Sequence, residues 1–275
     1  MVGVMNPQRG ASPPSEVTRP QIQPIQGEPA ALVTTPTARL VVVADIHAGI
    51  ESALRYERGV ELPSAATSRR RRLLGYCLDA DPDGVVLLGD VGHSIAAPRG
   101  AESDELVALL TVLASRWPVT VTPGNHDGDL SAWLADTAAI DPEVRSSITV
   151  SPPDGTVIDG VGFLHGHTWP HPSVVAQPLI CAAHEHPAVR LADSVGGSIR
   201  SRAWLRATVD RAALTEGDDV DGTTRLVVFP AFNSRSGSTW LSDRPEQLLS
   251  PYLPAVLEAG EVRTYLLDGT DLGPP

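Results

Sequence analysis

Short apolar runs alternate with stretches of helical periodicity through the first half of the chain. Residues 40–44 read LVVVA, a β-branched run typical of a strand that is covered on both faces. Similar runs at 85–88 and 119–122 predict two further strands. Between them, 64–78 and 102–117 have the character of helices. This alternation predicts parallel strands joined by helices.

The second half of the chain is richer in strands. A short helix is expected at 130–135, and it is followed by strand-like runs at 156–158, 162–164, 180–183, 203–209, 226–229 and 262–267. The two halves together predict an α/β fold of the α+β sandwich type, in which two mixed β-sheets pack face to face with helices on their outer faces. In such folds, ligands collect beyond the carboxyl ends of the strands.

The chain is expected to form one domain over 31–275, preceded by a flexible proline-rich tail over 1–30. The tail has prolines among polar residues and lacks the basic and apolar segments of a signal peptide. No run reaches the ~20 apolar residues that a membrane helix requires. We therefore expect a soluble, cytoplasmic protein without a membrane partner.

Composition predicts an acidic surface. The formal net charge is −12, and all 21 basic residues are arginine. Such a surface repels nucleic-acid phosphates, although salt screens the repulsion and a locally positive site can still act. The two cysteines, Cys77 and Cys181, lack metal-site spacing and are interpreted as reduced thiols. Net charge therefore disfavours a nucleic-acid substrate without excluding it.

The eight histidines fall in five short clusters, each of which follows or ends an apolar run. The clusters are Asp45-Ile-His47, Gly89-Asp90-Val-Gly-His93, Gly124-Asn125-His126-Asp127, His165-Gly-His167 with His171, and His184-Glu-His186. Strand ends that carry imidazole, carboxylate and amide groups are expected to converge on one metal site. A metal-dependent hydrolase is the function that this pattern favours.

These clusters resemble the signature of the calcineurin-like metallophosphoesterase superfamily, which runs D-x-H, G-D, G-N-H-D/E, a lone H and then G-H-x-H. The segments 45–51, 182–187 and 230–233 further resemble small archaeal and bacterial phosphoesterases related to SbcD-type DNA-repair nucleases. The resemblance covers about residue 40 to the C-terminus. Two positions depart from it, because Ala183 replaces a usual glycine and His93 replaces an aspartate found in many members.

The resemblance implies two metal ions that share one carboxylate. The ligands of one ion would be Asp45, His47, Asp90 and His186. The ligands of the other would be Asp90, Asn125, His165 and His184. The ions are expected to be Mn²⁺, with iron or zinc as alternatives, because the ligands are oxygen and nitrogen without thiolate.

The resemblance also implies roles around the metals. His126 would be the catalytic histidine that is not a ligand, stabilising charge on the phosphoryl group or protonating the leaving alkoxide. Asp127 would orient the ring of His126. Either His165 or His167 can be the ligand in its motif, and His165 is favoured because it comes directly off a strand.

Four residues are candidates for the substrate pocket: His93, His167, Arg55 and Asn233. His93 is equally well interpreted as a residue that hydrogen-bonds to a ligand. Arg55 and Arg58 can reach a substrate phosphate or can form ordinary surface ion pairs. The basic run 69–72 spans a full helical turn, so its members cannot all face one partner.

The function that follows is hydrolysis of a phosphoester bond by a water activated on two metals, with DNA or a nucleotide as the substrate of a phosphodiesterase or nuclease. A small-molecule phosphodiesterase or phosphatase is the alternative, and it needs an enclosed pocket. A catalytically silent metal-bound interaction module is disfavoured because every ligand and His126 are retained.

Overall fold

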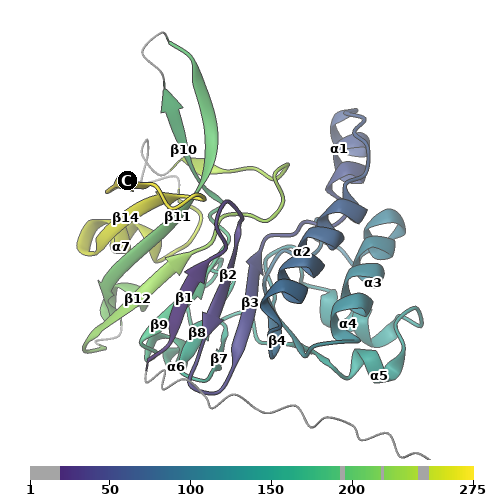
Figure 1. Ribbon diagram of the computed structural model, residues 1–275, viewed down its shortest axis with the longest axis horizontal. Helices are drawn as coiled ribbons and strands as arrows, with labels where there is room; N and C mark the ends of the chain where they lie inside the picture. Colours follow the sequence, from purple (N-terminus) through teal and green to yellow (C-terminus); the bar gives the residue numbers. More distant parts are fainter. Residues whose placement is uncertain (1–18, 193–195, 218–219, 241–247) are drawn as a thin grey trace, which may run out of the picture.

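Two β-sheets pack face to face at the centre of the molecule (Figure 1). The computed structural model describes residues 19–192, 196–217, 220–240 and 248–275. The first sheet has six described strands in chain order: β1 (Gln21–Pro24), β2 (Ala30–Thr34), β3 (Arg39–Ala44), β4 (Gly84–Leu88), β5 (Val119–Thr122) and β6 (Ile148–Val150). Strands β1 to β3 are antiparallel, whereas β3 to β6 are parallel.

The second sheet has nine described strands and is also mixed. Its main path runs through β13 (Thr239–Trp240), β10 (Pro187–Ala192), β11 (Ser198–Asp210), β12 (Thr223–Val228), β9 (Leu179–Ala182), β8 (Val161–Phe163) and β7 (Thr156–Ile158). Strand β14 (Glu261–Leu266) pairs with β11, and β15 (Asp271–Gly273) pairs with β14. The long β11 pairs with β10 through 198–202 and with β12 through 205–210, so β10 and the start of β11 form a projecting hairpin (Figure 1).

Helices cover the outer face of each sheet. The first sheet is covered by α2 (Ala66–Ala80), α3 (Gly100–Ala114), α4 (Leu130–Asp136) and α5 (Pro142–Arg145), whereas α1 (Ile50–Arg58) projects beyond the sheet (Figure 1). The second is covered by α6 (Pro172–Val175), the 3₁₀ helix η1 (Arg211–Leu214) and α7 (Leu253–Ala259).

The layered packing explains the apolar runs of the sequence. In β3, Val41 and Val43 pack against the helices, whereas Val42 and Ala44 pack against the second sheet. Successive strand residues point to opposite faces, so a strand between two layers must be apolar at every position. Each fully buried valine of this kind contributes roughly 1.5–3 kcal/mol.

The α+β sandwich expected from the sequence is confirmed, with one boundary corrected. The expected tail over 1–30 is too long, because β1 begins at Gln21 and pairs with β2. Ile22 packs against the core between the sheets, which explains why this short polar segment is ordered as an edge strand. Residues 1–18 of the expected tail lie outside the described residues. Within the described ranges, no helix has both the length and the apolar character needed to cross a membrane.

Candidate metal centre

The carboxyl ends of five strands carry the histidine motifs to one place. Strands β3, β4 and β5 come from the first sheet, and β8 and β9 come from the second. The loops are tied together by their backbones: His47 N–H donates to the Asp90 carbonyl (2.8 Å), and Ala183 N–H donates to the His165 carbonyl (2.7 Å). Within each of three groups of these side chains, the candidate ligand atoms lie within 4.8 Å of one another.

The first group consists of Asp45, His47, Asp90 and His186. His186 Nε2 lies 3.1 Å from Asp45 Oδ1 and 3.4 Å from His47 Nε2. His47 Nε2 lies 3.7 Å from Asp90 Oδ2. The structure therefore brings together the four residues that the sequence assigns to the first ion.

The second group consists of Asp90, His165 and His184. His165 Nε2 lies 3.1 Å from His184 Nδ1 and 3.6 Å from Asp90 Oδ1. Asp90 thus faces both groups, with a different carboxylate oxygen toward each. Asn125, the expected fourth ligand, is exposed, and it precedes His126, whose backbone N–H donates to Asp90 Oδ1 (3.0 Å).

Of the two histidines in the His-Gly-His motif, His165 lies in the second group. Its Nδ1–H donates to the Leu88 carbonyl (3.2 Å), which leaves the lone pair of Nε2 directed at the group. The ring of His167 is 5.3 Å from that of His165, and its Nδ1 is buried without a hydrogen-bond partner among the described residues. His171 lies apart from both groups and caps α6 by accepting from Ser173 N–H (3.2 Å).

The spacing of these atoms fits divalent ions. Nitrogen and oxygen ligands lie about 2.1 Å from such an ion, so two ligands of one ion are about 3.0–3.4 Å apart. The contacts between candidate ligands span 3.1–3.7 Å. Both carboxylate oxygens of Asp45 are buried, and His186 Nε2, 3.1 Å from Oδ1, is the side-chain group that lies against them in the described structure. A carboxylate buried in this way is stabilised by a cation, either a metal ion or protonated His186.

Burial sets the protonation states of the centre. Burial, assisted by the neighbouring His186, lowers the pKa of His47 to about 2, and burial lowers the pKa of His184 to about 4. These rings are therefore neutral at pH 7, the form that binds metal. Burial raises the pKa of Asp90 to about 8, and the charge of Asp45 adds to this shift. Burial alone would lower the pKa of His186, but Asp45 outweighs it and raises that pKa to about 9.

The backbone is left-handed at five of the candidate ligands. The φ angles are 54° at Asp45, 45° at His47, 43° at Asp90, 70° at His184 and 47° at His186. These are five of the seven non-glycine residues with positive φ in the described ranges. Such conformations are costly for residues with a Cβ and persist where surrounding contacts enforce them. The loops of the metal centre therefore hold backbone strain.

Two glycines allow the loops to approach one another closely. A Cβ atom at Gly124 would lie 2.1 Å from Asp90 Oδ1, and one at Gly89 would lie 2.3 Å from His165 Nδ1. Any larger side chain at these positions would displace a candidate ligand.

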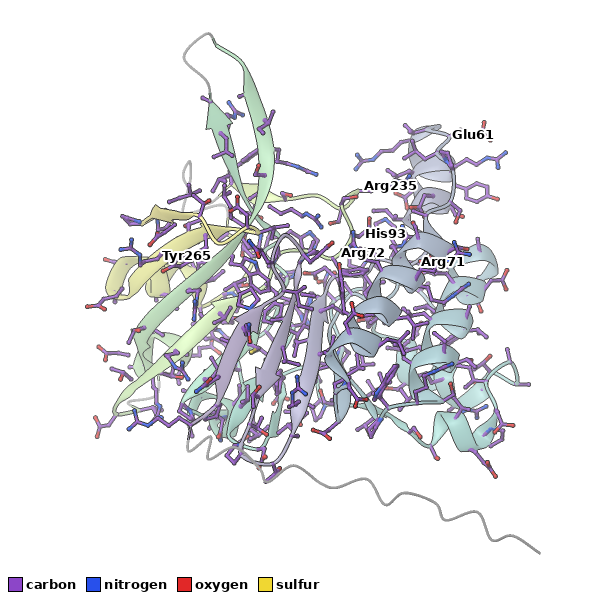
Figure 2. The ribbon with its side chains drawn as sticks, viewed as in Figure 1. Glu61, Arg71, Arg72, His93, Arg235 and Tyr265 are labelled. Carbon is purple, nitrogen blue, oxygen red and sulfur yellow. The ribbon has the colours of Figure 1, made fainter. Side chains whose placement is uncertain are left out.

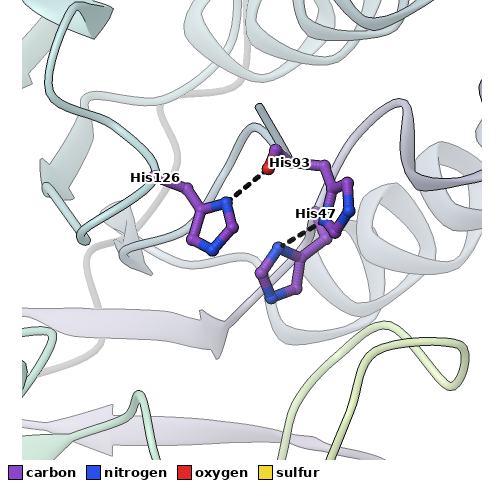
Figure 3. Close-up of side chains that lie close together, drawn as sticks. All are labelled: His47, His93 and His126. Atoms are coloured by element: carbon purple, nitrogen blue, oxygen red, sulfur yellow. Dashed lines mark hydrogen bonds between the residues drawn. The ribbon is translucent and has the colours of Figure 1, made fainter. Parts of the chain in front are cut away.

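His126 and His93 lie beside His47 and make up the third group with it, as Figure 3 shows. His126 Nδ1–H donates to the backbone carbonyl of His93, which fixes the tautomer of the neutral ring. The His93 and His47 Nδ1 atoms are 3.3 Å apart. With His47 Nε2 directed at the metal group, its Nδ1–H donates to His93, so His93 supports a candidate ligand as well as lining the cavity described below.

The expectation that Asp127 orients His126 is wrong. The Asp127 carboxylate instead accepts backbone N–H groups from Val91 (3.2 Å), Gly92 (3.2 Å) and Gly124 (2.9 Å). It therefore joins the loops that follow β4 and β5, and the His93 carbonyl takes the role that the sequence assigned to Asp127.

Two of the expected substrate residues also have other roles. Asn233 is 3% exposed, and its Nδ2 donates to the carbonyls of Ile46 (2.9 Å) and His47 (3.3 Å), so it holds the loop after β3 rather than a substrate. Arg55 is exposed and pairs with Glu61 at 3.8 Å, which is the surface ion pair considered as its alternative.

A cavity of about 590 Å³ opens at the metal centre. Its lining residues include His47, His93, His126, His186, Leu54, Glu57, Arg58, Arg200 and Arg235. Glu57, Arg58 and Arg200 are exposed, so the cavity is open to solvent on that side. Sequence patterns did not point to Arg200 or Arg235, because both reach the cavity through the packing of β11 and the loop after β12. A larger cavity, about 750 Å³, lies away from the histidines beside Arg206 and Arg225.

A buried ion-pair network supports the loop that carries His47. Arg69 on α2 binds Glu51 on α1 and Glu105 on α3, and Glu105 Oε2 accepts the Gly49 N–H (2.9 Å). Arg72 donates to the Phe232 carbonyl (2.6 Å) and lies over the Phe232 ring. Arg69 and Arg72, two of the four arginines in the run 69–72, therefore have structural roles.

Comparison with known proteins agrees with this geometry. Residues 38–243 match the family model of the calcineurin-like phosphoesterases. The chain belongs to this family. It is therefore a metallophosphoesterase, a hydrolase with a cluster of aspartate and histidine residues able to hold divalent metal.

Two solved structures are similar to this phosphoesterase. The nuclease MPE of Pseudomonas putida has 20% identity and a TM-score of 0.51, covering 92% of this chain and 100% of that chain. The phosphoesterase YfcE from E. coli has 18% identity and a TM-score of 0.32, covering 72% of this chain and 94% of that chain. The first likeness supports the fold. No curated protein matches the chain.

Proposed function

We propose that this metallophosphoesterase is a dinuclear phosphodiesterase that cleaves DNA strands. The observation that carries the proposal is the position of Asp90, whose Oδ2 faces His47 at 3.7 Å while its Oδ1 faces His165 at 3.6 Å. A carboxylate between two groups of imidazoles is the arrangement that a two-metal hydrolase needs. The similar Pseudomonas putida structure is that of a nuclease, which supports this choice of substrate.

The ligand sets follow from the two groups, with Asn125 added from its motif. We assign Asp45, His47, Asp90 and His186 to one ion, and Asp90, Asn125, His165 and His184 to the other. We propose Mn²⁺ because the ligands are carboxylate, amide and imidazole. Bound ions of this kind supply a nucleophilic water and neutralise charge on the phosphoryl group.

His126 is assigned as the group that acts on the leaving oxygen. Its side chain is 24% exposed, so it is accessible from the cavity, and its Nε2 lies 4.0 Å from Asp90 Oδ2. Because Nδ1–H donates to the His93 carbonyl, Nε2 is the nitrogen that faces the substrate. A protonated ring donates its Nε2–H to the leaving alkoxide.

An open cavity favours a diester over a small monoester. The exposed wall at Glu57, Arg58 and Arg200 leaves room for a chain that continues past the scissile phosphate. An enclosed pocket, which a small-molecule phosphatase needs, would have buried walls on all sides.

The test compares substrates and one substitution. Metal-stripped protein reloaded with Mn²⁺ is assayed on bis-p-nitrophenyl phosphate, on p-nitrophenyl phosphate and on single- and double-stranded DNA. We expect hydrolysis of the diester and of DNA, and a loss of about 10²–10⁴-fold in kcat on DNA for His126→Ala with unchanged metal content. His171→Ala, a histidine substitution outside the centre, is the matched control. Full activity of metal-loaded His126→Ala, or no hydrolysis with any divalent ion, would refute the proposal.

A further inference from the structure

The projecting hairpin of β10 and β11 carries arginines on one face. The register places Arg190 directly opposite Arg200, and Ala188 opposite Arg202. Cross-strand partners point to the same side of a sheet, and successive residues alternate, so Arg190, Arg200 and Arg202 share one side. We call these three residues the arginine face. Like charges directly opposite each other destabilise a strand pair, so the Arg190–Arg200 pair lowers the stability of the hairpin. Folding therefore does not account for this pair.

The arginine face adjoins the metal centre. Arg200 lines the same cavity as His126 and His186, and its Nη2 donates to the Ser234 carbonyl (3.2 Å). Arg202 Nη1 donates to the Ala231 carbonyl (2.9 Å). These contacts fix the base of the hairpin on the loop that follows β12. Helix α1 lines the cavity on the opposite side, and Figure 2 shows Arg235 between this helix and the hairpin.

The charge on the arginine face is available to an anion. The arginines that pair with carboxylates in the described ranges are Arg55, Arg69, Arg72, Arg235 and Arg263. Arg190 and Arg200 therefore have no carboxylate partner among the described residues, although the chain has an excess of acidic groups. Both are exposed, and the Arg190 guanidinium lies 5.3 Å from the centre of the Trp240 ring.

We infer that the arginine face binds the phosphate backbone of a single-stranded nucleic acid whose scissile phosphate lies at the metal centre. This inference rests on the proposed function and adds the surface that holds the strand. Guanidinium groups bind phosphates with paired hydrogen bonds and do not read the bases. A flat aromatic ring beside them suits base stacking. The cavity of about 590 Å³ has the size of a small-molecule site, which accommodates part of one strand rather than a duplex.

Affinity is expected to depend on the length of the substrate. A diester with one phosphate contacts only the metal centre, whereas a longer strand also contacts Arg190 and Arg200. Affinity for the longer strand therefore falls as salt rises. In a plot of the logarithm of the binding constant against the logarithm of the salt concentration, each phosphate contact on a single strand makes the slope steeper by about 0.7.

The experiment compares two charge-matched variants. Arg190→Ala/Arg200→Ala removes the exposed pair of the arginine face, and Arg39→Ala/Arg116→Ala removes two exposed arginines at the opposite, amino-terminal end of the first sheet. Binding of a fluorescent oligothymidylate is measured by anisotropy in a salt series, and hydrolysis of bis-p-nitrophenyl phosphate is measured in parallel.

We expect the hairpin variant to bind the oligonucleotide about 10-fold or more weakly, with a slope smaller by about 1.4, and to lose less in hydrolysis of the one-phosphate diester than in affinity for the oligonucleotide. The control variant binds as the wild type does, and Arg190→Lys/Arg200→Lys keeps most of the affinity. Equal affinity and slope in the two alanine variants would overturn the inference. Tighter binding of a fluorescent duplex of the same length, measured by the same anisotropy assay, would also overturn it. If the wild type fails to hydrolyse the diester, the proposed function fails, while the anisotropy series still decides the role of the hairpin.

Discussion

Replacement of Arg69 by methionine would remove the guanidinium that joins Glu51 to Glu105. All three side chains are 4–7% exposed. Arg69 Nη1 and Nη2 donate to the two carboxylate oxygens of Glu51 at 2.6 and 2.8 Å, and Nε and Nη2 donate to Glu105 at 2.8 and 2.7 Å. Burial would raise the pKa of Glu51, but Arg69 outweighs it and lowers that pKa. The substitution leaves two buried carboxylates without this cation.

The expected cost follows from those contacts. Breaking a buried pair from one side costs about 3–5 kcal/mol. Glu51 keeps Arg235 and Glu105 keeps the Gly49 N–H, so we expect the lower end, about 3 kcal/mol. At about 2–4 °C per kcal/mol for a chain near this size, the Tm falls by about 10 °C.

Thermal unfolding of the metal-free protein, followed by circular dichroism, measures this cost. Arg116→Met, at an exposed position, is the matched control and should stay within about 0.5 kcal/mol of the wild type. Because the folded-state pKa of Glu51 is lowered, its stabilisation is present above its ordinary pKa of 4.5 and is lost as pH falls through the folded-state value. The difference between wild type and Arg69→Met should therefore narrow in acid. A Tm for Arg69→Met equal to that of the control at neutral pH would refute the reasoning.

Three further predictions concern the metal centre. Gly124→Ala would place a Cβ 2.1 Å from Asp90 Oδ1, so affinity for Mn²⁺ in a titration should fall at least about 10-fold, and an unchanged affinity would contradict the packing. Asp127→Ala leaves three backbone N–H groups without their acceptor, so the free energy of unfolding should fall by about 1–3 kcal/mol for each group that stays buried and unpaired. The Tm should fall with it, and a wild-type Tm would count against the role of Asp127 in joining the two loops. Protons on Asp90, with its pKa near 8, and on His186, with its pKa near 9, compete with the ion. Mn²⁺ should therefore bind more tightly as pH rises from about 6 to 9, with proton release in calorimetry, whereas a flat profile would exclude this competition.

Strands β3, β4 and β5 of the first sheet were predictable, because their apolar runs show in the sequence that they are buried. A run such as 40–44 is apolar at every position, and only a strand covered on both faces requires that. Strands β1 and β10 were not predicted, because QIQP and PAVRLA mix exposed and buried positions and so lack a continuous apolar run. Helix α1 was missed for a similar reason, since few of its side chains are buried.

The residue types of the metal centre could be predicted from the sequence, but the hydrogen bonds around it could not. Clusters of histidine and aspartate after strands indicate metal chemistry wherever the chain places them, so the two ligand groups followed from the motifs. Asp127 and Asn233 have the same polar character, but apart from Gly124 the partners described above lie 35 or more residues away and depend on how the loops approach. Asp127 follows His126 in the sequence, but its carboxylate holds the loop after β4 rather than the His126 ring.

The left-handed backbone at Asp45, His47, Asp90, His184 and His186 has a consequence for engineering this enzyme. Glycine or asparagine adopts such angles at lower cost than aspartate or histidine, so substitutions there would relieve backbone strain while removing ligands. The metal centre is thus a place where heat resistance and catalysis oppose each other. Selection of variants for thermal tolerance alone would be expected to erode the ligand loops, and screens on this scaffold need to retain metal binding as a second criterion.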